Sequence, residues 1–490
     1  MVKAMTQPRY ELFFAVRLLV LAKYFGQFCL VIAALNLAPL AVALLAAETS
    51  IAFSYAGLIV GLSIAGILLA RIRHQGQMQM NEAMVLVALV FLAVPLLMTI
   101  PLVREGSAFI DAFFETVSAA TTTGLSSLGA IELRPRTFQF ARAWMQWYGG
   151  LGIVVFSLAL VVRPGMSALR LAELDKPDDL VGGTRAHARR ILLVYSGITL
   201  VGVLLWILLG GNPLQGFLYI FSAVSTGGFS PTSGSFADLD RTHLAWVVTL
   251  ISIAGAVPLA LYQQSWHSGW RRFVRNIEMR SFVAVGLLVS LLLGFSLMAQ
   301  GMGLNEAIRH GSLMAFSAQS TAGFSSLSVS SLDAGSKIIL ILAMATGGSV
   351  GSTAGGFKLL RLLILFGLLF RCLKRLSASP NAVIEQRLEQ RRIEASEVQD
   401  ALMIILLFVG VVIISWIPFL LYGYAPLDSL FEVVSATGTA GLSSGISDVS
   451  LPTLLKSVLC ADMLLGRLEF VAWMVFFYHR TWFGRKRVKL

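Results

Sequence analysis

The chain has 490 residues, of which 57% are hydrophobic and only 13% are charged, and its mean hydropathy is +0.79. Because a soluble domain carries about 25% charged residues, this composition excludes a soluble protein and predicts a polytopic helical membrane protein. The net charge of +12 would suit a nucleic-acid-binding protein, but the basic residues gather in short segments between apolar runs. We therefore interpret them as signals of membrane topology and expect no nucleic-acid partner.

The apolar runs predict an N-terminal region followed by four similar units. Residues 1–75 hold two apolar helices, separated near 46–50, and the first apolar stretch is too long for a cleavable signal peptide. Each unit has a first span, a short amphipathic helix, a loop and a second span, and a span needs about 20 apolar residues. We expect the units at 76–175, 176–275, 276–392 and 393–490, with second spans near 138–162, 243–264, 337–371 and 453–478.

A nine-residue phrase lies in the loop of every unit. It reads SAATTTGLS at 118–126, SAVSTGGFS at 222–230, SAQSTAGFS at 317–325 and SATGTAGLS at 435–443. The helix before each phrase is too short to cross a bilayer at about 1.5 Å per residue, so the chain must enter and return. Non-helical backbone at that depth is stable only where it lines a water-filled cavity. The four phrases therefore predict one pore with pseudo-fourfold symmetry.

The phrase suits a filter for monovalent cations. Backbone carbonyls can replace the water ligands of such an ion without a fixed charge, and glycine permits the unusual dihedral angles that point carbonyls inward. Close packing of small residues would explain one copy, but four copies in register argue against it. We expect the ion ligands, which form no transition-metal site, at Thr122, Thr123, Gly124, Thr226, Gly227, Gly228, Thr321, Ala322, Gly323, Thr439, Ala440 and Gly441.

Acidic residues precede the first and the fourth phrase. Asp111 and Glu115 stand seven and three positions before the first phrase, and Asp428 and Glu432 hold the same positions before the fourth. Two interpretations stay open. The carboxylates attract cations to the mouth of the pore, or they cap and pack the short helices.

The long apolar run 337–371 contains a glycine-rich segment, 346–356. So many glycines cannot form a lipid-facing helix, and we expect an irregular loop inside the protein, with a kinked helix as the alternative. A phosphate-binding loop is excluded, because that motif requires Gly-Lys-Ser/Thr and here Phe357 separates Gly356 from Lys358.

Arg467 lies in the apolar final span, where a guanidinium is costly and should face a partner or a cavity. The nearest acids, Asp462 and Glu469, are five and two residues away, so neither has the spacing of an intrahelical ion pair. An ion pair with another helix and a positive charge facing a cavity below the filter are both compatible with the sequence.

The basic segments define an orientation. By the positive-inside rule, the segments near 71–73, 163–190, 271–280, 358–392 and 480–489 are cytoplasmic, as are both termini, and the phrases face outward. We interpret Lys358 and Arg361 mostly as anchors of this kind. Each unit begins and ends inside, so the repeats run parallel, unlike the inverted halves of many secondary transporters.

Together, these features resemble the superfamily of K+ transporters, specifically its Trk-type membrane subunits, over nearly the whole chain. The resemblance implies K+ uptake across the bacterial inner membrane through a pseudo-tetrameric pore, a homodimer in membrane lipid, and a cytosolic partner with nucleotide-binding regulatory domains. It also implies that residues below the filter gate the pore, namely Gly347, Gly348, Ser349, Gly351, Gly355, Gly356 and Arg467. One departure is the unequal residue before each filter glycine, which puts strict fourfold selectivity in doubt.

Other functions find little support in the sequence. The six histidines show no metal-binding spacing and no hydrolase motif is present, so we predict no enzyme activity and no cofactor beyond the transported K+. An alternating-access carrier for another cation or small solute would require inverted repeats and a roomy midplane site. An intramembrane hydrolase would need a catalytic pair buried in adjacent spans.

Overall fold

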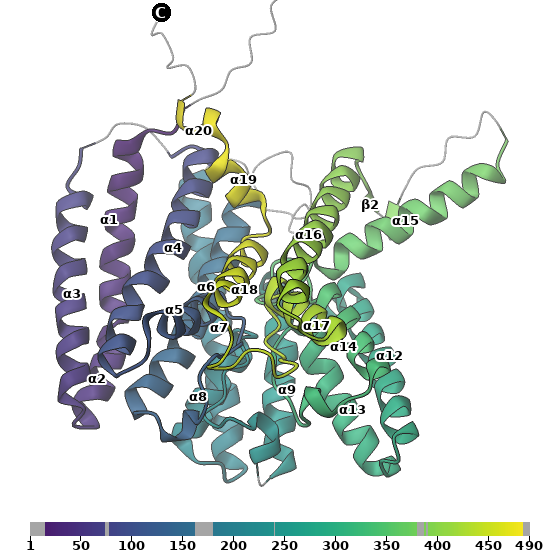
Figure 1. Ribbon diagram of the computed structural model, residues 1–490. Helices are drawn as coiled ribbons and strands as arrows, with labels where there is room; N and C mark the ends of the chain where they lie inside the picture. Colours follow the sequence, from purple (N-terminus) through teal and green to yellow (C-terminus); the bar gives the residue numbers. More distant parts are fainter. Residues whose placement is uncertain are drawn as a thin grey trace, which may run out of the picture.

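A computed structural model describes residues 15–73, 78–161, 180–239, 241–379, 387–388 and 391–483 (Figure 1). Apart from loops, this part of the chain is helical except for one pairing, in which β1 (Arg387–Leu388) runs antiparallel to β2 (Arg391–Arg392). Six of its helices are long and apolar enough to cross a membrane, or seven if one bent pair counts as a span. The predicted all-α polytopic class is confirmed. The two ends of the chain, which we expect in the cytoplasm, and most of the basic segment 163–190 lie outside the described residues.

Three helices form the N-terminal region, at the left of Figure 1: α1 (Leu18–Leu35), α2 (Leu37–Leu45) and α3 (Thr49–Ala70). Helix α1 packs along α3, and the two lie closest where Gly26 meets the last turn of α3. A Cβ atom on Gly26 would lie only 2.6 Å from Leu69 Cβ and 2.7 Å from the Ala70 nitrogen. Helices α1 and α3 contact the first helix of the first unit, so this region covers the first unit from one side.

The four units share a plan of long helix, short helix and second helix, the last of which is broken in three units. Their helices are α4 (Met80–Arg104), α5 (Phe109–Ala120) and α6 (Arg136–Val161); α7 (Leu180–Leu208), α8 (Pro213–Val224), α9 (Thr242–Ala256), α10 (Leu259–Ser268) and α11 (Trp270–Arg275); α12 (Ile277–Ala299), α13 (Leu304–Gln319), α14 (Ala334–Thr346) and α15 (Leu359–Leu376); α16 (Ala395–Leu421), α17 (Pro426–Thr437), α18 (Thr453–Arg467), α19 (Val471–Phe477) and α20 (His479–Phe483).

The units are arranged in a closed ring. The second helix of each unit packs against the short helix of the next, giving the pairs α6–α8, α9–α13, α14–α17 and α18–α5. The last pair joins the fourth unit to the first, although more than 300 residues separate them in the chain. The short helices α5, α8, α13 and α17 all end at the third residue of their phrase. Their negative C-terminal ends therefore lead directly into the phrases.

Two second spans that the sequence predicts as continuous are broken. The span expected at 243–264 bends by 86° between α9 and α10, where Pro258 supplies no N–H and cannot continue the helix. The span expected at 453–478 stops after Arg467, and Glu469 and Phe470 adopt left-handed φ angles of 52° and 63° before α19 begins. In the third unit the chain between α14 and α15 is irregular. Only in the first unit is the second helix, α6, continuous.

The close approach of α1 and α3 predicts the effect of a methyl group. Gly26→Ala should destabilise the protein by about 1–3 kcal/mol, because the Cβ meets backbone that cannot move independently. Gly57→Ala on α3 is the matched control, because nothing lies within 4 Å of its Cβ position. Thermal unfolding in detergent measures both, and equal melting temperatures for the two variants would contradict the described packing.

Candidate ion-conducting site

The four phrases meet around one axis, where the glycine of each phrase contacts a backbone carbonyl of the next phrase. A Cβ atom on Gly124 would overlap the carbonyl oxygen of Gly227, the residue before the glycine of the second phrase. The same relation connects the second phrase to the third, the third to the fourth, and the fourth back to the first, through the pairs Gly228–Ala322, Gly323–Ala440 and Gly441–Thr123. We call this closed set of four contacts the glycine ring. Residues larger than glycine cannot occupy these positions without opening it.

The sign of the backbone angle φ alternates within each phrase. The four glycines have positive φ angles of 74° to 94°, which confirms the expectation of unusual dihedrals. The threonine two positions earlier is also left-handed in every copy, with φ between 47° and 54°, at Thr122, Thr226, Thr321 and Thr439. Such angles are strained for a β-branched residue, and nothing in the sequence pattern revealed them. The residue between the threonine and the glycine has no positive φ in any copy, so the sign of φ alternates along these three residues.

The N–H groups of the phrases are bound on the helix side. The N–H of the sixth residue donates to the carbonyl of the opening serine in all four copies, at 2.7–2.9 Å. The N–H of the fifth residue, the threonine, donates to the carbonyl of the second residue, an alanine, at 3.0–3.1 Å. Because these donors point back toward the short helices, the carbonyls of the same peptides, which belong to the fourth and fifth residues, are directed away from those helices.

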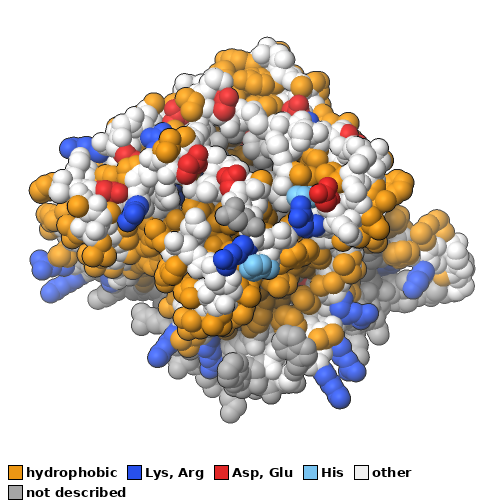
Figure 2. Space-filling model, turned by 90° about the horizontal axis from the view of Figure 1, so that it is seen from below, with side chains coloured by type: hydrophobic (Ala, Val, Ile, Leu, Met, Phe, Trp, Pro, Cys, Tyr) orange, Lys and Arg blue, Asp and Glu red, His pale blue; other side chains and the backbone are white. Residues whose placement is uncertain are grey.

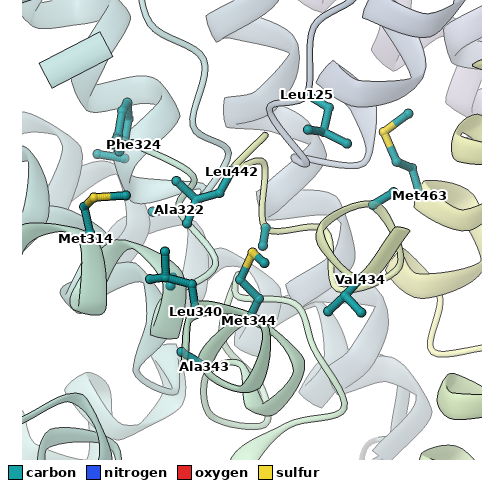
Figure 3. Packing of buried hydrophobic residues seen from close by; sticks show 14 of the residues in the cluster. Leu125, Met314, Ala322, Phe324, Leu340, Ala343, Met344, Val434, Leu442 and Met463 are labelled. Carbon is teal, nitrogen blue, oxygen red and sulfur yellow. The ribbon is translucent and has the colours of Figure 1, made fainter. Parts of the chain in front are cut away.

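The eighth residue anchors each phrase in the apolar core. It is Leu or Phe in every copy, and all four side chains are buried: Leu125, Phe229, Phe324 and Leu442. Figure 3 shows Leu125, Phe324 and Leu442 pointing into the packing around Met314, Met344 and Met463. The large eighth residue of each phrase is therefore explained by packing against the protein.

A cavity of about 440 Å³ opens on one side of the glycine ring. All four ring glycines contribute to its wall, together with closing serines of the phrases, such as Ser126 and Ser230. Figure 2 shows this face of the molecule, with Asp and Glu side chains scattered around a central hollow. No cluster of three or more His, Cys, Asp or Glu side chains that could hold a metal ion occurs among the described residues.

Two of the acidic residues before the phrases connect neighbouring units. Asp111 on α5 pairs with Lys456 on α18 at 2.6 Å, and Asp428 on α17 pairs with Lys337 on α14 at 2.7 Å. Each pair joins the short helix of one unit to the second helix of the preceding unit. The two lysines were not singled out from the sequence, because the register between helices so far apart in the chain cannot be read from spacing.

The other two acids hold their own phrases. Glu115 pairs with Arg142 of α6 at 2.8 Å and accepts a hydrogen bond from the Ser127 N–H, while Glu432 accepts bonds from Ser443 and Ser444. Both carboxylates are fully buried. All four acids therefore make the packing contacts that one of the two interpretations predicts.

On the other side of the glycine ring lies the irregular segment between α14 and α15. Its backbone and side chains bond to three phrases: Thr353 Oγ1 donates to the Val224 carbonyl at 3.0 Å, the Gly355 N–H to Thr321 Oγ1 at 2.7 Å, and the Gly356 N–H to the Gly438 carbonyl at 2.9 Å. These partners are the third, fifth and fourth residues of their phrases, whereas the cavity on the other side, the outer cavity, touches the seventh residues, the ring glycines. The segment therefore lies against the ring on the side opposite the cavity, which we call the inner end of the ring.

Arg467 lies against this segment. Its side chain is 4% exposed, and Nη1 donates to the Thr353 carbonyl at 2.8 Å. Nε and Nη2 have no hydrogen-bond partner, and within the described ranges no carboxylate pairs with the guanidinium. Of the two acids nearby in sequence, Asp462 accepts from Ser415 and Glu469 pairs with Arg361. The positive charge therefore faces a narrow space that Thr439 and Gly355 also line.

Lys358, which the sequence suggests mostly as an anchor of topology, also makes contacts inside the protein. It is 6% exposed, has a left-handed φ of 71°, and its Nζ donates to the Ala354 carbonyl within the same segment. It lines the same narrow space as Arg467. Arg361, one turn further along α15, is tied by its ion pair to Glu469 at the break after α18. Both basic residues thus belong to the inner end of the ring.

Comparison with known proteins gives a consistent family assignment. The model of the family TrkH, described as cation transport protein, matches residues 52–482. An uncharacterized cation transporter of Methanocaldococcus jannaschii is 26% identical over 85% of this chain and 86% of its own length. The Trk system potassium uptake protein TrkH of Salmonella typhimurium is 27% identical over 84% of this chain and 88% of its own. The crystal structure of the potassium transporter TrkH from Vibrio parahaemolyticus has the same fold, with a TM-score of 0.86, 22% identity, and coverage of 95% of this chain and 100% of that one.

The ion pairs between units predict unequal effects of two similar substitutions. Lys456→Met leaves Asp111 buried without its cation, because both side chains are under 10% exposed, and should cost about 3–5 kcal/mol of stability. Lys337→Met is the matched control, since water reaches Asp428, whose side chain is 32% exposed. Thermal unfolding in detergent should therefore show the larger loss for Lys456→Met, and a larger loss for Lys337→Met would contradict this account.

Proposed function

Because the chain belongs to the TrkH family of cation transport proteins, we propose that it takes up K+ across the bacterial inner membrane through the glycine ring. The curated relatives named potassium uptake proteins support the choice of ion. The single observation that carries the proposal is the closed set of four glycine–carbonyl contacts. In a ring of this kind, each ligand position of the phrase contributes four carbonyls, one from each unit, to an ion on the axis.

The chemistry of the ring favours a dehydrated monovalent cation. Each phrase contributes neutral carbonyl oxygens, which replace water ligands without the strong attraction of a carboxylate, so that the ion binds and also leaves. The proposed ligands are the carbonyls at positions five to seven of the four phrases, from Thr122–Gly124 to Thr439–Gly441. A carrier for a larger solute is disfavoured, because neighbouring phrases touch and leave no roomy site between them.

The segment 346–356 and Arg467 are the proposed gate. The segment bonds to the inner ends of three phrases, and the unpaired guanidinium places a positive charge beside the path of a cation. A passing K+ must therefore displace backbone and overcome like-charge repulsion. Opening requires movement of the segment. The segment continues directly into α15, and Arg361 of α15 pairs with Glu469 of the fourth unit.

The family assignment is also the basis for the proposed oligomeric state and partner. We propose that the protein functions as a homodimer in membrane lipid and binds a cytosolic nucleotide-binding regulatory subunit on the side of α15, with both termini in the cytoplasm. Helix α15 projects from the body of the molecule (Figure 1) and carries exposed basic residues in its last turn, namely Lys374 and Arg375. It is therefore the element through which a cytosolic partner would act on the gate.

The function is tested by uptake of radioactive Rb+ into proteoliposomes containing the purified protein. We expect uptake that K+ inhibits more strongly than Na+ does, and Gly441→Ser should reduce this difference because its side chain meets the Thr123 carbonyl. Repeating the assay with an imposed proton gradient determines whether transport is coupled to H+. Absence of Rb+ uptake, or equal inhibition by K+ and Na+ in the wild type, would contradict the proposed function.

The gate is tested by removing its charge. Arg467→Ala should raise basal Rb+ flux about tenfold or more, because a unit charge at a few Å contributes about 2–4 kcal/mol at an effective dielectric constant near 20. Arg467→Lys keeps the charge and is the matched control, and deletion of 347–355 should also raise the flux. A flux through Arg467→Ala no greater than that of the wild type would show that the arginine is purely structural.

A further inference from the structure

The four phrases are unequal at the residue before the ring glycine. This residue is Thr123, Gly227, Ala322 or Ala440, so only the second phrase lacks a side chain there. The space is not empty. A Cβ atom on Gly227 would lie 2.5 Å from Cδ and 2.6 Å from Oε1 of Gln146, a residue of α6 in the first unit. The Gln146 side chain of the first unit therefore occupies the space that a side chain at position 227 of the second unit would need.

Both polar atoms of the Gln146 amide bind the second phrase. Nε2 donates to the Gly227 carbonyl at 2.5 Å, and Oε1 accepts from the Phe229 N–H at 3.2 Å. One partner is an acceptor and the other is a donor, so the orientation of the amide is determined. Gln146 is fully buried, and therefore loss of either bond would leave a buried polar group without a partner.

The backbone of α6 keeps Gln146 in position. Just beyond it, a Cβ on Gly149 would overlap the Ala120 carbonyl at the end of α5, and a Cβ on Gly150 would lie 2.8 Å from Ser225 Cβ after α8. Two adjacent glycines thus bring the helix against two phrases at once. In this unit α6 is also the unbroken second helix, so it can support the filter without the flexibility of a break.

We propose that Gln146 is a positioning and specificity-determining residue of the filter. The Gly227 carbonyl that it binds is the one that Gly124 contacts in the glycine ring. Without a side chain, the Gly227 peptide would rotate more freely than its three counterparts, and Gln146 prevents this rotation. The bound carbonyl also shares its lone pairs with the amide, so it is a weaker ion ligand than the other three. This inference rests on the proposed function.

The pairing is tested with a double-mutant cycle. Gln146→Leu keeps the volume but removes both bonds, and the preference for K+ over Na+ as competitors of Rb+ uptake should fall at least about fivefold, the factor expected for one lost hydrogen bond. Gly227→Ala should lower flux and melting temperature, because its Cβ overlaps Gln146. Gln146→Ala alone completes the cycle, and its combination with Gly227→Ala recreates the arrangement of the third and fourth phrases and should recover most of the losses of the two single variants.

The matched control is Gln139→Ala on the same helix. The Gln139 amide binds the carbonyls of Ile131 and Arg134 in its own unit and does not contact a phrase, so ion preference should not change. An unchanged preference in Gln146→Leu, or a double variant no better than Gly227→Ala, would overturn the inference. If the wild type carried no Rb+, the proposed function would fail separately, and the melting temperatures of the cycle would still support or overturn the pairing.

Discussion

The contact between a glycine Cα and the carbonyl of the neighbouring phrase is the constraint on which the rest of the structure depends. It leaves no room for a Cβ at Gly124, Gly228, Gly323 or Gly441. Such close approach requires contacts that fix each phrase on the side away from the ring. The buried eighth residues and the N–H bonds to the short helices provide these contacts. It also requires strain, because a left-handed threonine precedes every ring glycine by two positions.

The backbone of the glycine ring is alike in all four units, but the contacts that stabilise it differ from unit to unit. Ion pairs connect the third unit to the fourth and the fourth to the first, whereas the first unit supports the second through the Gln146 amide. At the inner end only the third unit contributes the irregular segment, and only the fourth contributes Arg467. A single chain can distribute these tasks among its units, which four identical subunits cannot. The four units can therefore share one carbonyl geometry, while the proposed gate depends on residues of only two units.

The fold class and the repeated phrase could be predicted from the sequence. The register in which distant helices pack against one another could not. The all-α polytopic class and the positive φ of the ring glycines follow from apolar runs and from a phrase repeated four times. Lys456, Gln146 and the burial of Lys358 did not follow, because each depends on which residues of distant helices face one another. The bend at Pro258 was overlooked because proline within an apolar run is tolerated in many membrane helices.

The central claim is that a cation binds on the axis of the glycine ring. Crystals of the protein grown with Rb+ or Tl+ in place of K+ test it directly through anomalous scattering. The account predicts anomalous density on the axis, at similar distances from the carbonyl oxygens of Thr123, Gly227, Ala322 and Ala440. Density confined to the outer cavity or to an acidic side chain, with none between the four phrases, would contradict it.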